Sequence, residues 1–204
     1  MEDYVQHYRE FGYAIIRKVL GQQDIEKLSA SCDALLKQSE QYERSFRHKN
    51  QLFLIQNDAE KGKVLRFMAW PSYTNNVFER YRTDSRLLQI VKPLIGDTLK
   101  QVSNQVIWKP PETQSTSYGF HQDARFRRPA SAFRNIGNSY IQTAIAIDEH
   151  RPENGCLKIV SGSHRAGYIN RDFKESVFDQ DCTEEVLLEW GLGGHAIVNI
   201  DLEP

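Results

Sequence analysis

The sequence has little cysteine, no long apolar run and almost no net charge, and each of these absences narrows the possibilities. The 204 residues include three cysteines, Cys32, Cys156 and Cys182, and no CxxC pair. This usage favours reduced thiols over a disulfide framework or a zinc site. No stretch approaches the roughly 20 apolar residues needed to span a bilayer, and the charged N-terminus lacks the apolar core of a signal peptide. We therefore expect a cytoplasmic protein with no membrane partner.

Charge and hydrophobicity set further limits. Lys and Arg number 26 against 27 Asp and Glu, which gives a formal net charge of −1. Such a balance provides no general attraction to nucleic acid, so we expect no nucleic-acid partner. Hydrophobic residues make up 40% and aromatic residues 11% of the chain, enough to bury a core. The length predicts one domain that spans residues 1–204.

The hydrophobic pattern changes along the chain. Apolar residues at helical spacing predict helices at about 3–10, 23–38 and 85–94. Short apolar or alternating runs between turn residues predict strands at 13–17, 102–109, 118–123, 140–148, 156–160 and 196–201. Helices in about 1–98 followed by strands in about 99–204 predict an α+β, mainly β fold. Its expected core is a double-sheet jelly roll with the N-terminal helices packed on it.

The sharpest local feature is the sequence His121-Gln122-Asp123. On a strand, side chains two residues apart leave the same face, so His121 and Asp123 should converge while Gln122 points away. One imidazole and one carboxylate are two of the three ligands of a 2-His-1-carboxylate iron site. Taken alone the pattern is weak, because a chance match is expected on the order of once in a chain like this.

An ordered set of motifs surrounds this pattern. Val106-Ile-Trp-Lys-Pro-Pro111 precedes it, and Glu153-Asn-Gly-Cys-Leu157 and Val160-Ser-Gly-Ser-His164 follow it. Together with the N-terminal Phe11-Gly-Tyr-Ala-Ile-Ile16, the set resembles the phytanoyl-CoA dioxygenase family over nearly the whole chain. The turn before His164 has serine where the family has proline.

This resemblance implies an Fe(II)- and 2-oxoglutarate-dependent dioxygenase with a double-stranded β-helix, or cupin-like, core. It implies that His121 and Asp123 are iron ligands and catalytic residues. The expected reaction hydroxylates a C–H bond of a small organic substrate while 2-oxoglutarate becomes succinate and CO2. The carboxylate of Asp123 favours hydroxylation, because halogenating relatives carry a small residue there. By the same resemblance, the residues near the co-substrate 2-oxoglutarate are Arg66, Gln122 and Ala144.

The family's third ligand, a late histidine, and its later oxoglutarate-binding arginine have no clear equivalents here. The sequence ends His195-Ala-Ile-Val-Asn-Ile-Asp-Leu-Glu-Pro204, where relatives continue into that histidine, so we expect a fragment or truncated form. His195 is a weak substitute ligand, and His164 is expected to be structural. Two alternatives stay open: a catalytically incomplete jelly-roll domain with a binding role, and a metal-binding cupin that uses His195 without 2-oxoglutarate.

An arginine-rich segment, residues 124–134, follows the His-x-Asp pattern. Guanidinium groups pair with carboxylates and phosphates, so Arg127 and Arg128 are candidate contacts to an anionic substrate. An exposed loop with solvated charges is the alternative.

Overall fold

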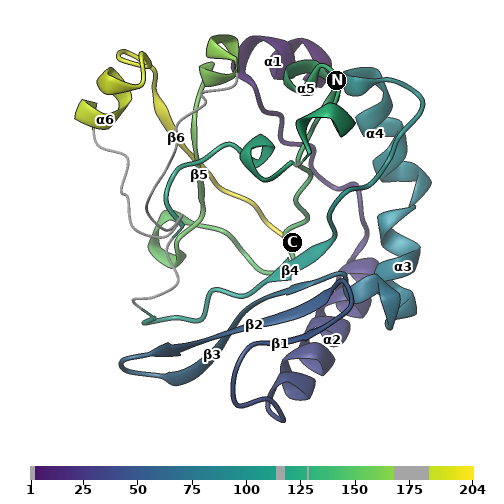
Figure 1. Ribbon diagram of the computed structural model, residues 1–204. Helices are drawn as coiled ribbons and strands as arrows, with labels where there is room; N and C mark the ends of the chain where they lie inside the picture. The colour runs from purple at the N-terminus through teal and green to yellow at the C-terminus, as the bar shows by residue number, and fades with distance from the viewer. Residues whose placement is uncertain (1–2, 114–117, 128, 168–183) are drawn as a thin grey trace. The chain divides into compact units, whose positions relative to one another are not determined.

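The computed structural model describes residues 3–113, 118–127, 129–167 and 184–204, with Arg125, Ala130 and Glu184 described by their backbone alone. The helices are α1 (Tyr4–Phe11), α2 (Gln22–Ser39), α3 (Asn76–Arg82), α4 (Ser85–Ile95), α5 (Ile136–Ser139) and α6 (Glu184–Glu189). The strands are β1 (Phe46–His48), β2 (Gln51–Asp58), β3 (Gly62–Ala69), β4 (Gln105–Ile107), β5 (Leu157–Val160) and β6 (Ile197–Ile200) (Figure 1).

The chain divides into two compact units. Unit 1 takes in the described parts of Met1–Arg17, Ile90–Leu99 and Tyr118–Glu203, and unit 2 takes in those of Lys18–Gln89 and Lys100–Ser117. Each unit has its own antiparallel sheet. The mixture of helices with antiparallel strands agrees with the α+β part of the sequence prediction. That residues 1–204 form one domain stays a prediction.

Unit 2 is built on an antiparallel sheet with the strand order β1-β2-β3-β4. The turn between β2 and β3 has a clear local cause. The Asp58 carboxylate accepts hydrogen bonds from the backbone N–H groups of Glu60 and Lys61 at 3.0 and 3.2 Å. Gly62 then takes a φ of +70°, which favours glycine because it has no Cβ. The side-chain turn and the glycine together reverse the chain and fix the pairing of Asp58 with Gly62.

Arg66 is the extra residue of a β-bulge in this sheet. Leu54 faces Phe67 and Ile55 faces Leu65, so the register of β2 against β3 shifts at Arg66. The Arg66 side chain is fully buried, and its carbonyl accepts the N–H of Trp108 at 2.9 Å. A bulge bends its strand and changes the direction of the inserted side chain, which accounts for the inward position of a cationic residue.

The predicted helix α2 begins and ends within one residue of its expected bounds. Its buried stripe, with residues three and four apart, consists of Ile25, Leu28, Ser31, Cys32, Leu35 and Ser39. The helix contacts α3, whose buried residues are Phe78 and Tyr81. The sheet adds Phe53, Ile55, Val64, Leu65 and Met68 to the core of unit 2.

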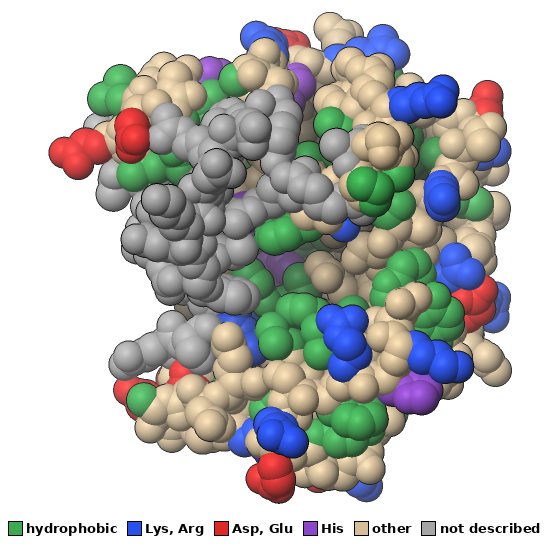
Figure 2. Space-filling model, viewed as in Figure 1, with side chains coloured by type: hydrophobic (Ala, Val, Ile, Leu, Met, Phe, Trp, Pro, Cys, Tyr) green, Lys and Arg blue, Asp and Glu red, His purple; other side chains and the backbone are tan. Residues whose placement is uncertain are grey.

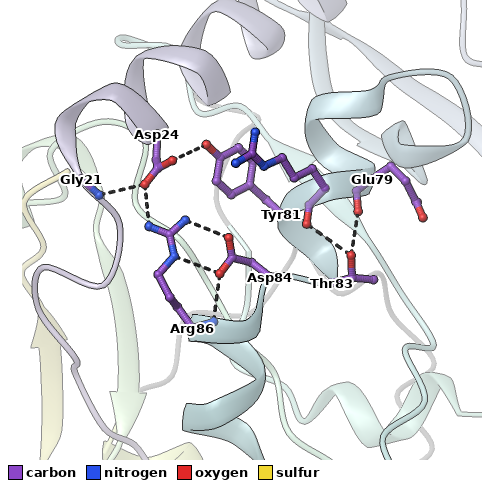
Figure 3. Close-up of polar contacts among 8 residues, drawn as sticks. Gly21, Asp24, Glu79, Tyr81, Thr83, Asp84 and Arg86 are labelled. Atoms are coloured by element: carbon purple, nitrogen blue, oxygen red, sulfur yellow. Dashed lines mark hydrogen bonds and ion pairs between the residues drawn. The ribbon is translucent and has the colours of Figure 1, made fainter.

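A polar network links α2 to the start of α4 (Figure 3). Arg86 donates to the Asp24 carboxylate at 2.7 Å and to Asp84 at 2.8 Å, and the Tyr81 hydroxyl donates to Asp24 at 2.6 Å. The Asp24 carboxylate also accepts the backbone N–H of Gly21 at 3.1 Å. These bonds, led by the one from Arg86, hold the pKa of Asp24 well below its usual range. The ionised form of Asp24 therefore stabilises the junction between the helices.

In unit 1, a turn contributed by distant residues caps the C-terminal end of α1. Asp3 caps the N-terminal end, and Gly12 ends the helix in the left-handed conformation with a φ of +82°. The carbonyls of Arg9 and Phe11 accept hydrogen bonds from His164 Nε2 at 3.0 Å and from the Gly162 N–H at 2.8 Å. Carbonyls in the last turn of a helix have no helical partner, so these bonds tie α1 to the turn.

A second cluster of unit 1 surrounds β5 and α6. Strand β5 pairs with β6 in antiparallel register, from Leu157 opposite Ile200 to Val160 opposite Ile197. Val160, Leu187 and Leu192 form a buried core, against which Phe120 and Trp190 pack. The core therefore holds the residue that immediately precedes His121.

Several predicted strands were wrong. Residues 13–17, 118–122 and 140–148 are irregular, Asp123 begins a 3-10 turn, and the strand expected at 102–109 shortens to β4. Apolar alternation makes a strand only where a neighbouring strand completes the hydrogen bonds, and no described strand pairs with these segments. Helices occupy more of the described residues than strands do, so the expectation of a mainly β fold is also corrected. Residues 1–98 are less helical than predicted, because β1, β2 and β3 lie there.

Candidate metal centre

His121 and Asp123 lie side by side in unit 1. The distance from His121 Nε2 to Asp123 Oδ1 is 3.1 Å, and the two side chains are 24% and 27% exposed. The sequence predicted this convergence from strand geometry, whereas the structure achieves it differently. Residues 118–122 are irregular, and Asp123 begins a 3-10 turn that extends to Phe126. The pair is accessible to a small ligand from solvent.

The hydrogen bonds of His121 determine which of its ring nitrogens can bind a metal. Nδ1 lies 2.7 Å from the carbonyl oxygen of Gly119. A carbonyl only accepts, so Nδ1 carries the proton, and in the neutral ring Nε2 has the lone pair. This is the common arrangement of a metal-binding histidine, in which a backbone carbonyl fixes the tautomer.

The donor atoms also have a separation that suits a shared cation. Nε2 and a carboxylate oxygen both present lone pairs across 3.1 Å, a contact that requires a proton or a cation. Metal bonds of about 2.1 Å at a right angle hold two ligand atoms about 3.0 Å apart. The pair therefore fits two adjacent positions of one metal ion. Its role as metal ligands stays a prediction.

The Gln122 side chain contacts Gly167, which follows the turn that contains His164. Its Nε2 donates to the carbonyl of Gly167 at 2.9 Å. That Gln122 lies near 2-oxoglutarate, or faces away from His121 and Asp123, stays a prediction. Gly167 has a φ of +73°, a conformation that suits glycine and aims its carbonyl. The backbone between the two predicted ligands is thus tied to residues that also hold α1.

Two other histidines of unit 1 were raised as ligands by the sequence. His195 Nδ1 donates to the carbonyl of Ser161 at 2.7 Å, which leaves the lone pair on Nε2 as in His121, whereas His164 caps α1. Among the described residues, no group of three His, Cys, Asp or Glu side chains is arranged to hold a metal ion. A structural role for His164 agrees with the sequence interpretation. The third ligand, expected beyond Pro204, stays a prediction.

The remaining predicted site residues have varied environments. Arg127 donates from Nη2 to the Tyr140 hydroxyl at 2.6 Å, while Arg128 lies outside the described residues. Ala144 is exposed in the irregular segment 140–148. Arg66 belongs to unit 2, where it is buried at the bulge of β3. Binding of 2-oxoglutarate by Arg66 and Ala144 stays a prediction.

Tyr140 is a residue that the sequence interpretation missed. Burial raises the pKa of its phenol, and the negative charge of Asp123 raises it further, against the opposing effect of Arg127. Tyr140 and Arg127 contact each other through their hydrogen bond, and the charge of Asp123 acts on the Tyr140 phenol. The available signal was a tyrosine, an aromatic residue with a polar hydroxyl, six residues after the arginine-rich segment.

On the face shown in Figure 2, the described residues do not form a concentrated basic patch. The Lys and Arg side chains of the described residues are scattered there, with Asp and Glu and uncharged surface between them. None of the described helices combines the length and the apolar character needed to cross a membrane.

Comparison with known proteins identifies one family over most of the chain. The sequence profile of the family described as phytanoyl-CoA dioxygenase (PhyH) matches residues 8–203. Dioxygenase lolE1 of Epichloe uncinata is 33% identical over 78 residues. That alignment covers 38% of this chain and 27% of the Epichloe protein, so the match spans about a quarter of that relative.

Proposed function

Because the chain belongs to the phytanoyl-CoA dioxygenase family, we propose that it is an oxygenase that hydroxylates a C–H bond of a small organic substrate with Fe(II) and 2-oxoglutarate. The observation that carries this proposal is the convergence of His121 and Asp123, whose donor atoms lie 3.1 Å apart. The proposal includes the family's double-stranded β-helix core, its cytoplasmic setting and the conversion of 2-oxoglutarate to succinate and CO2.

His121 Nε2 and Asp123 Oδ1 are the atoms that would hold Fe(II). When bound with 2-oxoglutarate, the iron supplies the oxidising power that side chains lack. Imidazole and carboxylate donors suit Fe(II) because they bind it and leave its redox chemistry intact. The carboxylate of Asp123 supports hydroxylation, since it occupies the position that a halide ligand would need.

The residues around the pair have a positioning role in this proposal. The Gly119 carbonyl keeps the proton on Nδ1, so the His121 lone pair stays directed at the metal position. Phe120 packs against the core of β5 and α6 and fixes the backbone beside His121. The Gln122–Gly167 hydrogen bond fixes the backbone on the other side of His121. A ligand pair held from both sides loses little conformational entropy when it binds a metal.

Arg127 is our proposed contact to the substrate. It directly follows the 3-10 turn that begins at Asp123, and its backbone N–H closes that turn on the carbonyl of Ala124 at 3.0 Å. Its positive charge would bind an anionic group of the substrate while the C–H bond to be oxidised faces the metal. We also propose Arg128 as a substrate contact, on the basis of the sequence alone.

The test is anaerobic addition of Fe(II) and 2-oxoglutarate, followed by the visible charge-transfer absorption that forms when both bind together. We expect the band with the wild-type chain and its loss in the His121→Ala and Asp123→Ala variants. His150→Ala is the matched control, because the hydrogen bonds between His150 and Leu202 are made by backbone atoms that alanine retains. Absence of the band from the wild-type chain would favour a fragment whose third ligand lies beyond Pro204, or a jelly-roll domain with a binding role. Absence of Fe(II) binding to the wild-type chain in calorimetry would refute the proposed ligand pair.

A further inference from the structure

Arg127, the proposed substrate contact, forms a polar pair with Tyr140 in unit 1. The guanidinium donates from Nη2 to the phenol oxygen at 2.6 Å, and its central carbon lies 5.0 Å from the centroid of the tyrosine ring. The contact joins residues 13 apart in sequence, and both are partly buried. A hydrogen bond from a charged donor in a partly dry setting fixes both side chains.

The phenol proton has a poor acceptor in this arrangement. The Tyr140 oxygen accepts from Arg127, so its own hydrogen points elsewhere, and the amide oxygen of Gln142 lies 3.4 Å away. A good O–H···O bond measures about 2.7–2.8 Å, so this bond is weak. Burial and the nearby Asp123 carboxylate raise the pKa of Tyr140 and keep the phenol protonated. Tyr140 is therefore a donor that a better acceptor can recruit.

The pair also lies close to the predicted metal ligands along the chain. Asp123 begins the 3-10 turn and Arg127 follows it, and a rise of about 2.0 Å per residue places their backbones roughly 8 Å apart. That distance is the length of a small organic molecule. The Tyr140 hydroxyl lies within the electrostatic influence of Asp123.

The geometry points to a carboxylate-binding site in which the Arg127 guanidinium supplies the charge and the Tyr140 hydroxyl supplies a directed hydrogen bond. The carboxylate replaces the weak contact of Tyr140 with Gln142 and gains the positive charge beside it. That the site holds a substrate beside the metal rests on the proposed function, whereas the binding of a carboxylate by Arg127 and Tyr140 does not. The carboxylate can belong to the substrate or to 2-oxoglutarate, since both offer the same group.

The site lies a short way along the chain from the predicted metal ligands. The backbones of Asp123 and Arg127 are roughly 8 Å apart by the rise of the turn, which is the scale of a compact organic acid. A substrate with an ammonium group at the same end would be repelled by Arg127.

The test uses pentanoate and its neutral isostere pentanamide, with binding measured by ligand-detected NMR on protein that has been freed of metal by a chelating resin. We expect pentanoate to bind the wild-type chain at least tenfold more tightly than pentanamide. The Tyr140→Phe and Arg127→Met variants should each weaken pentanoate binding roughly tenfold, because a hydrogen bond to a charged group is lost. Tyr73→Phe and Arg134→Met are matched controls, since both residues are exposed, and they should leave the affinity unchanged.

A second arm titrates 2-oxoglutarate with Mn(II) into the same variants and identifies the source of the carboxylate. If Tyr140→Phe weakens pentanoate binding but not 2-oxoglutarate binding, the site serves the substrate. If it weakens 2-oxoglutarate binding about tenfold, the site serves the co-substrate. Equal binding of pentanoate and pentanamide, or unchanged affinities for both acids in both variants, would overturn the inference. Because the first arm contains no metal, its outcome is independent of whether the iron proposal holds.

Discussion

Replacing Gly12 by alanine should destabilise the protein through two separable effects. Gly12 ends α1 with a φ of +82°, where an L-residue with a Cβ costs about 1–2 kcal/mol. The new Cβ would also overlap the His164 ring, reaching 2.9 Å from its Cγ. His164 would then have to leave its hydrogen bond to the Arg9 carbonyl, at a further cost of about 0.5–1.5 kcal/mol. The expected total is about 1.5–3.5 kcal/mol of unfolding free energy.

A double-mutant cycle distinguishes the two effects. His164→Ala alone should cost about 1 kcal/mol, because it removes the hydrogen bond that caps α1. In the His164→Ala background the overlap is gone, so Gly12→Ala should cost only the backbone term of about 1–2 kcal/mol. The predicted coupling between the sites is therefore about 1 kcal/mol. Urea denaturation followed by circular dichroism at constant pH measures all four species.

Additive costs in that cycle would refute the contact between the α1 terminus and the turn of His164. A gain in stability from Gly12→Ala would refute the left-handed cap as well, because alanine is the better residue wherever φ is negative. The His164→Ala variant also tests whether His164 is only structural. If it is, this variant should bind metal with nearly the affinity of the wild-type chain.

Three further perturbations test other parts of the structure. Asp24→Asn should lower stability at pH 7. Arg86 depresses the folded-state pKa of Asp24, so the ionised carboxylate stabilises the fold and this stabilisation is lost on protonation. The difference in unfolding free energy between wild type and variant should therefore shrink below about pH 4. Urea titrations at pH 7 and pH 3 measure it. Leu187→Ala should lower the unfolding free energy by about 2–5 kcal/mol, because Leu187 is 4% exposed. The neighbouring Leu188 is 67% exposed, so Leu188→Ala should cause only a small change. Thermal denaturation compares the two variants. Gln122→Leu should weaken metal binding roughly tenfold without unfolding the chain, as measured by calorimetry.

Helices α1, α2 and α4 were predictable because their determinants are local, whereas α3, α5 and α6 were missed. The buried stripe of α2 recurs at helical spacing, and Gly12 ends α1 as its sequence position suggested. The β2–β3 hairpin was missed although its turn signals, Asp58 and Gly62, are visible in the sequence. Its apolar run Leu52–Ile55 is continuous rather than alternating, and a run of this length does not distinguish a strand from a helix.

The strands that failed show the limit of local patterns. Residues 140–148 contain a short apolar run that suits a buried strand, yet the conformation depends on partners from elsewhere in the chain. At the site, the i, i+2 spacing sufficed to bring His121 and Asp123 together. The Arg127–Tyr140 contact could not be predicted, because it depends on the path of the segment between them.

The most direct test of the central claim, that His121 and Asp123 hold a metal ion, is a titration with Mn(II) followed by two-dimensional 1H–15N NMR. Paramagnetic broadening detects even weak binding and identifies the residues nearest the ion. We predict that broadening begins at Gly119–Ala124, disappears in His121→Ala and in Asp123→Ala, and persists in His164→Ala. Broadening that centres elsewhere, or that survives the loss of both His121 and Asp123, would contradict the assignment.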